Sequence, residues 1–384
     1  MPTPLQLLAW STVTIGVCFV GFVVWYLMTH ALAGAPGRDI HNYILAGLRL
    51  NIGHPLYGYG PGDERIATEG FADYPLYSPP LIAVVFRLVV LLPANGEYLW
   101  WIAMDTLELL AVAMLIRRAP LLAGVALIVL GVPIGVLLEF GNVDCLVAFG
   151  MLVAWRWLVD GHDDRAAIVI AVLASLKLTP VIFVWWLFVT GRRRAAAVAI
   201  GVGVVCALIA MLGTEPLIMA KFVQVTTTNV AGPATTTGAA GLAGMVGLPS
   251  AIYAWLPRVI LVSGIGAMFV MRRRPGVAFA IGASLMWLAS PIASVHTPAL
   301  LLVALAPLAW PMARAIAGGE PDSSVGTPGP DEQSEAPLTS REFAPGPTLS
   351  TKSALSRRDR VAARRGTRAT RPRQGHSRWP DPAP

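Results

Sequence analysis

Long apolar segments recur along about the first 316 residues, and they constrain the fold of this chain more than any other feature. They occupy about residues 8–29, 97–116, 120–138, 143–159, 164–190, 195–213, 252–271, 276–291 and 296–315. A helix of about 20 apolar residues can cross the hydrocarbon core of a bilayer. Hydrophobic residues make up 55% of the chain and charged residues only 13%, a composition that excludes an ordinary soluble domain. We therefore expect an all-α polytopic membrane protein.

Arginine clusters orient these segments in the membrane. They stand at segment ends, at positions 117–118, 192–194 and 272–274. The positive-inside rule places all of them in the cytoplasm. Segment 164–190 would then begin and end on the cytoplasmic side, so it must turn back, and Lys177 with Pro180 marks the break. The sequence thus predicts about ten membrane helices with both termini in the cytoplasm.

Three other regions have different patterns. Residues 80–93 are too short to span a bilayer, which predicts a helix lying in the outer interface. Apolar residues at helical spacing predict a second surface helix over residues 39–51. Residues 317–384 are rich in Pro, Ser, Gly, Thr and Arg, which predicts a disordered basic cytoplasmic tail. This tail can contact anionic membrane lipids, or it can be a simple solvated tail. Residues 1–316 form the transmembrane domain in this interpretation.

The predicted topology gathers polar residues on the extracytoplasmic side. Asp39 follows the first segment, Asn142 lies at a junction between segments, and Lys177 lies at the predicted break. Asn229 belongs to a long threonine-rich loop, and His296 stands in a turn before the last segment. Because these residues come from five separate parts of the chain, their common side indicates a candidate active site.

Each of these residues has a functional and a structural interpretation. Asp39 can act as a general base toward a sugar hydroxyl, or it can be a loop carboxylate paired with Arg38. Lys177 can bind a phosphate, or its side chain can simply extend to the interface. His296 can donate to a phosphate or sugar hydroxyl, or it can be an ordinary hydrogen-bonded loop residue. Asn142, together with Asp144, can be a helix cap and nothing more.

Several classes of function lack support in the sequence. It contains no phosphate-binding Gly-Lys-Ser/Thr loop, no zinc-ligand spacing and no Gly-x-Ser-x-Gly motif. The net charge of +7 comes from helix ends and the tail, which does not indicate nucleic-acid binding. The three cysteines lie within apolar runs and indicate neither a disulfide framework nor a metal site. We expect no cofactor, although the sequence leaves a divalent metal open.

A series of motifs follows one another along the sequence. In order, they are Asp39, Tyr43, Gly47, Gly53-His54-Pro55-Leu56-Tyr57, Tyr77-Ser78-Pro79-Pro80, Gly141-Asn142, Lys177-x-x-Pro180, and Ser290-Pro291-Ile292 with His296. This series resembles glycosyltransferase family 87, the actinobacterial membrane mannosyl- and arabinofuranosyltransferases of the GT-C type. The resemblance implies a GT-C-like fold and inverting transfer of a sugar, with mannose favoured, from a polyprenyl-phosphate donor. The acceptor would be a lipid-linked glycan at the outer face of the plasma membrane.

The resemblance also implies roles for individual residues. Asp39 and His296 match the family's catalytic aspartate and histidine, and Lys177 matches a region near the donor phosphate. We expect Arg38 to assist Lys177 at the phosphate. The sugar-contacting residues expected are Tyr43, Asn142 and Asn229.

A transporter or flippase of a lipid-linked cell-envelope intermediate is the alternative function. It would also need many helices and a polar outer cavity, together with ionisable residues near the bilayer midplane. Asp105 and Glu108, close together in segment 97–116, are the acidic candidates for such a role. A structural scaffold would explain the basic tail but not the polar residues on the outer side.

Overall fold

The structure is a computed structural model that describes residues 3–31, 38–57, 76–92, 95–228, 237–290 and 293–312. Within these residues the regular elements are all helices, as the sequence predicted. The chain divides into two compact units, Met1–Ala317 and Gly318–Pro384, and every described residue belongs to the first. The predicted tail at 317–384 lies outside the described residues.

By length and composition, four of the described helices can cross a membrane. They are α1 (Pro4–Tyr26), α4 (Gly96–Arg118), α10 (Arg193–Gly213) and α13 (Ser250–Val270). The pair α5 (Pro120–Val129) and α6 (Gly131–Phe140) would make a fifth span if the two form one broken helix. The predicted count of about ten membrane helices therefore stays a prediction.

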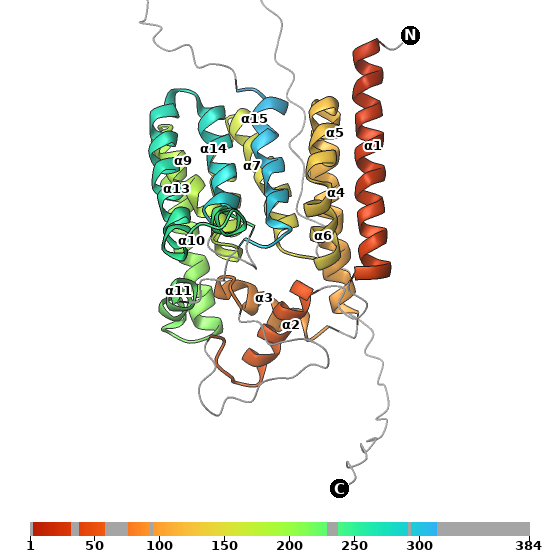
Figure 1. The fold of residues 1–384 in the computed structure, drawn as a ribbon. Coiled ribbons are helices and arrows are strands. Elements are labelled where there is room, and N and C mark those ends of the chain that lie inside the picture. The colour runs from red at the N-terminus through yellow and green to blue at the C-terminus, as the bar shows by residue number, and fades with distance from the viewer. Residues whose placement is uncertain are drawn as a thin grey trace, which may run out of the picture. The chain divides into compact units, whose positions relative to one another are not determined.

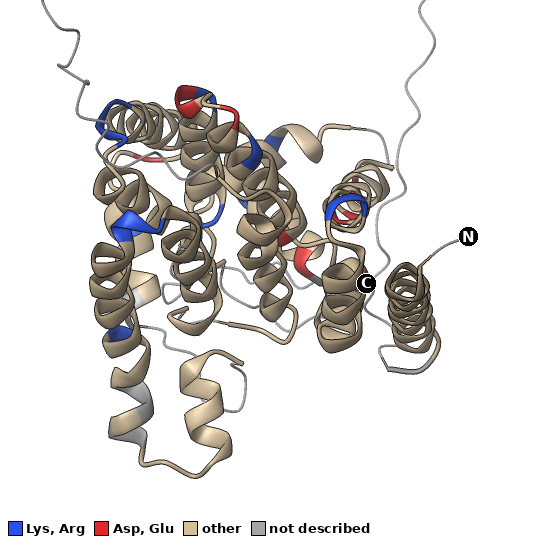
Figure 2. Ribbon diagram, turned by 90° about the horizontal axis from the view of Figure 1, so that it is seen from above, with Lys and Arg blue, Asp and Glu red and all other residues tan. Residues whose placement is uncertain are grey.

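The other described helices are shorter. They include η1 (Leu27–Ala31), α7 (Asp144–Val159), α12 (Ala239–Met245), η4 (Met271–Arg273), α14 (Pro275–Leu288), η5 (Thr297–Leu305) and α15 (Ala306–Ala309). The described part of the last predicted segment, 296–312, thus contains a 3₁₀ helix followed by one α-helical turn. Seen along the bundle in Figure 2, most of the ribbon carries neither acidic nor basic residues.

The predicted break inside segment 164–190 is confirmed. Helix α8 (Asp163–Leu176) ends at Lys177, which has an extended backbone, and η2 (Thr179–Val181) leads into α9 (Ile182–Val189). Pro180 lacks the N–H that would continue the hydrogen-bond ladder, so α8 cannot run through it. The break therefore places Lys177 at the end of a helix, where its backbone is free to leave the helical path.

The predicted apolar segment 120–138 is not a single straight helix. Helices α5 and α6 meet at Leu130 and are bent by 75° relative to each other. Pro133 explains the break, because it has no N–H to donate to the carbonyl of Val129 and its ring excludes the regular helix before it. Helix α6 ends at Phe140 and α7 begins at Asp144, so Asn142 lies in the short junction between them.

Helix α7 is the centre of the larger hydrophobic core. Its Trp155 is fully buried and packs against Phe279 of α14 at a ring distance of 4.4 Å. The indole N–H of Trp155 donates to the carbonyl of Trp310, and that of Trp186 donates to the carbonyl of Pro275, both at 3.0 Å. Satisfying these donors within the protein matters because lipid offers no partner for them. These contacts fix the C-terminal half of α7 within the bundle.

A second, smaller core joins the surface helices at one end of the bundle (Figure 1). The predicted helices at 39–51 and 80–93 are present as α2 (Arg38–Asn51) and α3 (Pro80–Val89), and α11 (Ile218–Thr228) lies beside them. Arg87 of α3 donates to Asn51 of α2 at 3.0 Å and to the carbonyl of Gly213 at 2.8 Å. These bonds tie the surface helices to the end of α10.

Candidate active site

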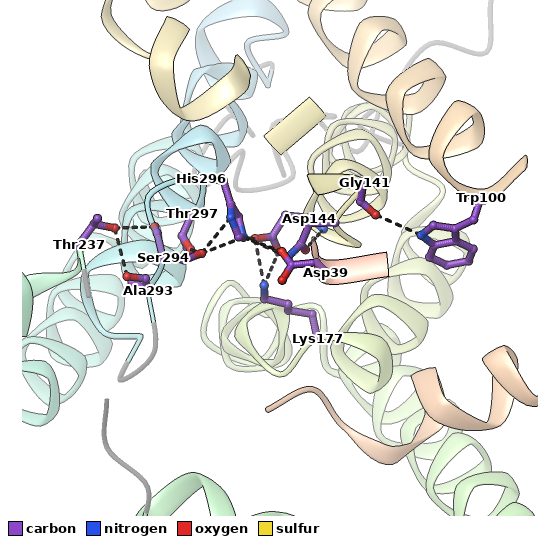
Figure 3. A network of polar contacts seen from close by, with 11 residues as sticks. Asp39, Trp100, Gly141, Asp144, Lys177, Thr237, Ala293, Ser294, His296 and Thr297 are labelled. Atoms are coloured by element: carbon purple, nitrogen blue, oxygen red, sulfur yellow. Dashed lines mark hydrogen bonds and ion pairs between the residues drawn. The ribbon is translucent and has the colours of Figure 1, made fainter. Parts of the chain in front are cut away.

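Polar side chains from four separate parts of the fold meet where the two cores join (Figure 3). Asp39 comes from the first turn of α2, while Asn142 and Asp144 come from the junction of α6 and α7. Lys177 follows α8, and His296 precedes η5. The structure thus brings together four of the predicted site residues and adds Asp144, which the sequence indicated only as part of a possible cap.

Asn142 links the members of this cluster. Its amide nitrogen donates to Asp39 Oδ2 at 2.6 Å and lies 3.0 Å from Nε2 of His296. Its amide oxygen accepts the backbone N–H of Asp144 at 2.8 Å. The amide oxygen of Asn142 thus caps the start of α7, as the structural interpretation expected. The amide nitrogen does not take part in the cap, because it contacts two candidate catalytic residues.

The junction between α6 and α7 has a shape that depends on glycine. Gly141 has φ of +57°, and a Cβ added there would overlap the side chain of Ile40. The carbonyl of Gly141 accepts from the indole of Trp100 at 3.1 Å, which holds the turn from the side of α4. A left-handed residue at this point directs Asn142 toward Asp39.

Lys177 is bound to a carboxylate in this structure. Its Nζ lies 2.9 Å from Oδ1 and 3.0 Å from Oδ2 of Asp144. The Asp144 side chain is fully buried, whereas the Lys177 side chain keeps 20% of its surface exposed. Because an ammonium has three donors, a lysine held in this way can still donate to an anion at its exposed side.

The imidazole of His296 is nearly buried at the centre of the cluster. Its Nε2 lies 3.8 Å from Oδ2 of Asp39 and 3.6 Å from Oδ2 of Asp144. Burial lowers the pKa of His296 below the ordinary 6.5, and this effect exceeds the opposite effect of the two carboxylates; Lys177 lowers the pKa further. Burial therefore favours the neutral form of the imidazole beside the two carboxylates.

The tautomer of His296 follows from its neighbours. The amide nitrogen of Asn142 can only donate, so Nε2 accepts and the ring proton is on Nδ1. Ser294 Oγ lies 2.9 Å from both ring nitrogens and can accept that proton. Thr237 in turn donates to the carbonyl of Ser294 at 2.6 Å, which anchors the loop that carries the histidine.

The other predicted site residues are Tyr43, Arg38 and Asn229, and the structure describes a side chain for Tyr43 alone. Tyr43 is 4% exposed and packs against Phe86 in the smaller core, one turn along α2 from Asp39. Its expected contact with a sugar stays a prediction. Arg38 begins α2, but its side chain lies outside the described residues, as does all of Asn229.

Two residues of the cluster had weak or absent signals in the sequence. Asp144 was recognisable as a carboxylate at the start of an apolar run, but only as a possible cap. Ser294 gave no signal, because a serine two residues before a histidine is common in loops. Within the described residues, no group of three or more His, Cys, Asp or Glu side chains could hold a metal ion.

Comparison with known proteins gives one match. The family model of glycosyltransferase family 87 matches residues 76–291, more than half of the 384-residue chain. The matched range contains Asn142, Asp144 and Lys177, whereas Asp39 and His296 lie outside it. No curated protein and no solved structure matched the chain.

Proposed function

On the premise that this chain belongs to glycosyltransferase family 87, we propose that it transfers mannose from a polyprenyl-phosphate donor to a lipid-linked glycan. The family and the apolar helices make it a membrane glycosyltransferase. The donor, the sugar, the acceptor and the outer face of the plasma membrane as the place of reaction belong to the proposal. The observation that carries it is the buried cluster joining Asp39, His296 and Lys177 through Asn142 and Asp144.

Asp39 is the general base in this proposal. Its Oδ2 is held by Asn142, and its side chain keeps 20% of its surface exposed, so an acceptor hydroxyl can approach Oδ1. The acceptor oxygen forms a bond to the anomeric carbon of the sugar, and its proton goes to Asp39. The hydrogen bond from Asn142 fixes the orientation of the carboxylate before the substrate arrives.

Lys177 and His296 bind the departing phosphate in this proposal. The bond between the anomeric carbon and the phosphate oxygen breaks as the acceptor attacks from the opposite side, which inverts the configuration of the sugar. The polyprenyl phosphate leaves with one additional negative charge. The ammonium of Lys177 stabilises that charge directly, and His296 can add a hydrogen bond by donating its Nδ1–H to the phosphate in place of Ser294 Oγ.

The test is the substitution Asp39→Asn, which keeps size and hydrogen bonding but removes the basic oxygen. We expect transfer from a polyprenyl-phosphate sugar, measured in membranes with equal amounts of protein, to fall about 10²-fold or more. Asp163→Asn is the matched control, because Asp163 is a partly exposed carboxylate paired with Arg192 at 3.1 Å outside the cluster. Equal rates for wild type and Asp39→Asn would refute the assignment of the base.

A flippase of a lipid-linked intermediate is a second candidate, because of Glu108. This residue lies in the membrane helix α4, is fully buried, and neither of its carboxylate oxygens has a hydrogen-bond partner among the described residues. Buried carboxylates within membrane helices commonly mark transport pathways. Translocation of the lipid without sugar transfer by the wild type, abolished by Glu108→Gln, would favour this function over the enzyme.

A further inference from the structure

The loop that carries His296 is held by the start of a helix that is distant in the sequence (Figure 3). Thr237, two residues before α12, donates its hydroxyl to the carbonyl of Ser294 at 2.6 Å and lies 3.2 Å from the carbonyl of Ala293. Its backbone N–H also donates to the carbonyl of Ala293. These bonds join residues 56 and 57 positions apart in the chain. They fix the backbone of the loop directly before the histidine.

Glycine at the next position makes this contact close. A Cβ added at Gly238 would lie 3.1 Å from the Cβ of Ala293, 3.1 Å from the carbonyl oxygen of Trp287 and 3.2 Å from that of Ser290. A residue without a side chain is what allows the two backbones to approach in this way. Thr237 and Gly238 together form what we call the α12 clamp, which contacts both the end of α14 and the loop before η5.

Ser294 transmits the position of the clamp to the imidazole. Its carbonyl accepts from Thr237, while its hydroxyl lies 2.9 Å from Nδ1 of His296. At the opposite side of the cluster, Asn142 lies 3.0 Å from Nε2. An imidazole held from both sides cannot turn without losing one of these hydrogen bonds. The direction of its Nδ1–H is therefore set by where the loop is held.

We propose that Thr237 and Ser294 are positioning residues, through which the α12 clamp sets the direction in which His296 donates to the leaving phosphate. The inference rests on the proposed function, in which His296 hydrogen-bonds that phosphate. Ser294 Oγ accepts the Nδ1–H until a phosphate oxygen replaces it, and Thr237 keeps the loop in place during this exchange. Misplacement of a reacting group by about 1 Å can cost about 10²-fold in rate, so a clamp on this loop affects the reaction itself.

The test needs variants that separate a positioning role from ordinary support of the fold. Thr237→Val keeps the shape of the side chain and the backbone N–H, but it removes the hydroxyl that donates to Ser294. Thr237→Ser restores a hydroxyl. Thr190→Val is the matched control, because Thr190 also donates its hydroxyl to a backbone carbonyl, that of Trp186 at 2.7 Å, away from the cluster.

The first experiment measures steady-state transfer from a polyprenyl-phosphate sugar. Negative charge on the phosphate grows as the bond to the sugar breaks, so a misdirected hydrogen bond should affect kcat more than KM. We expect Thr237→Val to lower kcat about tenfold and to leave the donor KM within about twofold. Thr237→Ser should recover most of the loss, and Thr190→Val should behave as wild type. A raised KM with unchanged kcat, or no recovery in Thr237→Ser, would overturn the proposal.

The second experiment asks whether Thr237 acts through His296. If it does, Thr237→Val should lower kcat by less than about twofold in a chain that already carries His296→Gln, because the group that it positions is gone. A further loss as large as the loss in the wild-type background would show that Thr237 acts independently of the histidine, and it would overturn the proposal.

The third experiment needs no sugar transfer. The protein is labelled with ¹⁵N-histidine, and the ring signals of His296 are identified by their absence in His296→Gln. We expect Thr237→Val and Ser294→Ala to shift or broaden these signals, and Thr190→Val to leave them unchanged. Such shifts without transfer by the wild type would support the clamp and reject the enzyme. Transfer by the wild type, with unchanged ring signals in Thr237→Val, would overturn the clamp and leave the enzyme in place.

Discussion

Two lysine–carboxylate pairs in this molecule have similar geometry and different surroundings. Lys177 contacts both oxygens of Asp144 at 2.9 and 3.0 Å, and Lys221 contacts both oxygens of Glu215 at 2.7 and 2.8 Å. The second pair is 40% and 35% exposed, whereas the first is 20% and 0% exposed. Water can replace either partner of the second pair, but it cannot solvate Asp144.

The difference extends to what each pair connects. Lys221 and Glu215 are six residues apart, so their pair links adjacent parts of the chain. Lys177 and Asp144 come from the ends of different helices, and Asp144 also approaches His296. A short ion-pair distance therefore says little by itself. Burial and connection to further polar groups mark Lys177 as a candidate for function.

Lys177→Met should produce the largest effect, because it leaves the buried Asp144 without its cation. We expect a loss of about 3–5 kcal/mol in the free energy of unfolding, measured by denaturant titration in detergent micelles. Transfer should fall about 10²-fold or more in the protein that remains folded. Unchanged stability would show that Asp144 finds another partner, and the contrast between the two pairs would fail.

The double variant Lys177→Met with Asp144→Leu should separate structure from function. Replacing both members of a buried ion pair by apolar side chains is often neutral, so stability should return to within about 1 kcal/mol of wild type. Transfer should stay as low as in the single variant, because the cation for the phosphate is still missing. Recovery of transfer together with stability would mean that the pair only holds α7 against α8.

Helix breaks show how much of this site could be predicted from sequence. Pro180 after an apolar run and a lysine in the same stretch were visible, and they predicted where Lys177 leaves its helix. Pro133 was also visible, but the apolar residues around it gave no reason to prefer a bend over a straight helix. An apolar pattern indicates only that a segment is buried in protein or lipid. In a membrane protein, a straight helix and a bent helix both bury their apolar residues, so the pattern does not distinguish them.

The partners within the cluster could not be predicted in the same way. The positive-inside rule predicted that Asp39, Lys177 and His296 lie on one side of the membrane. The rule does not predict the distances between their side chains. Asn142 joins Asp39 to His296 across 103 and 154 residues of sequence separation, which depends on the packing of α2, α7 and η5. The contact of Ser294 with the ring nitrogens of His296 depends on the same packing. Such contacts follow from tertiary structure and have no local sequence signal.

The pH dependence of stability should report the burial of His296. Its pKa is lowered in the folded protein, so the unfolded chain binds the proton more tightly. Stability from this residue should be present above the ordinary pKa of 6.5 and decrease as the pH falls below that value. Unfolding in detergent at a series of pH values measures this decrease, and His296→Gln should remove it. A wild type whose stability rises on acidification through this range would contradict a neutral, buried imidazole.

Lys221→Met should produce the smallest effect and completes the comparison. The substitution is the same as at Lys177, but Glu215 is 35% exposed and can be hydrated once its partner is lost. We expect a change of about 0–1 kcal/mol in the free energy of unfolding, which is the range for exposed ion pairs. Transfer should stay within about twofold of wild type, since Lys221 does not contact the cluster joined by Asn142. The same titration and transfer assays serve for both lysines. A loss at Lys221 as large as the loss at Lys177 would show that any lysine near this end of the bundle is needed, and burial would no longer distinguish the two pairs.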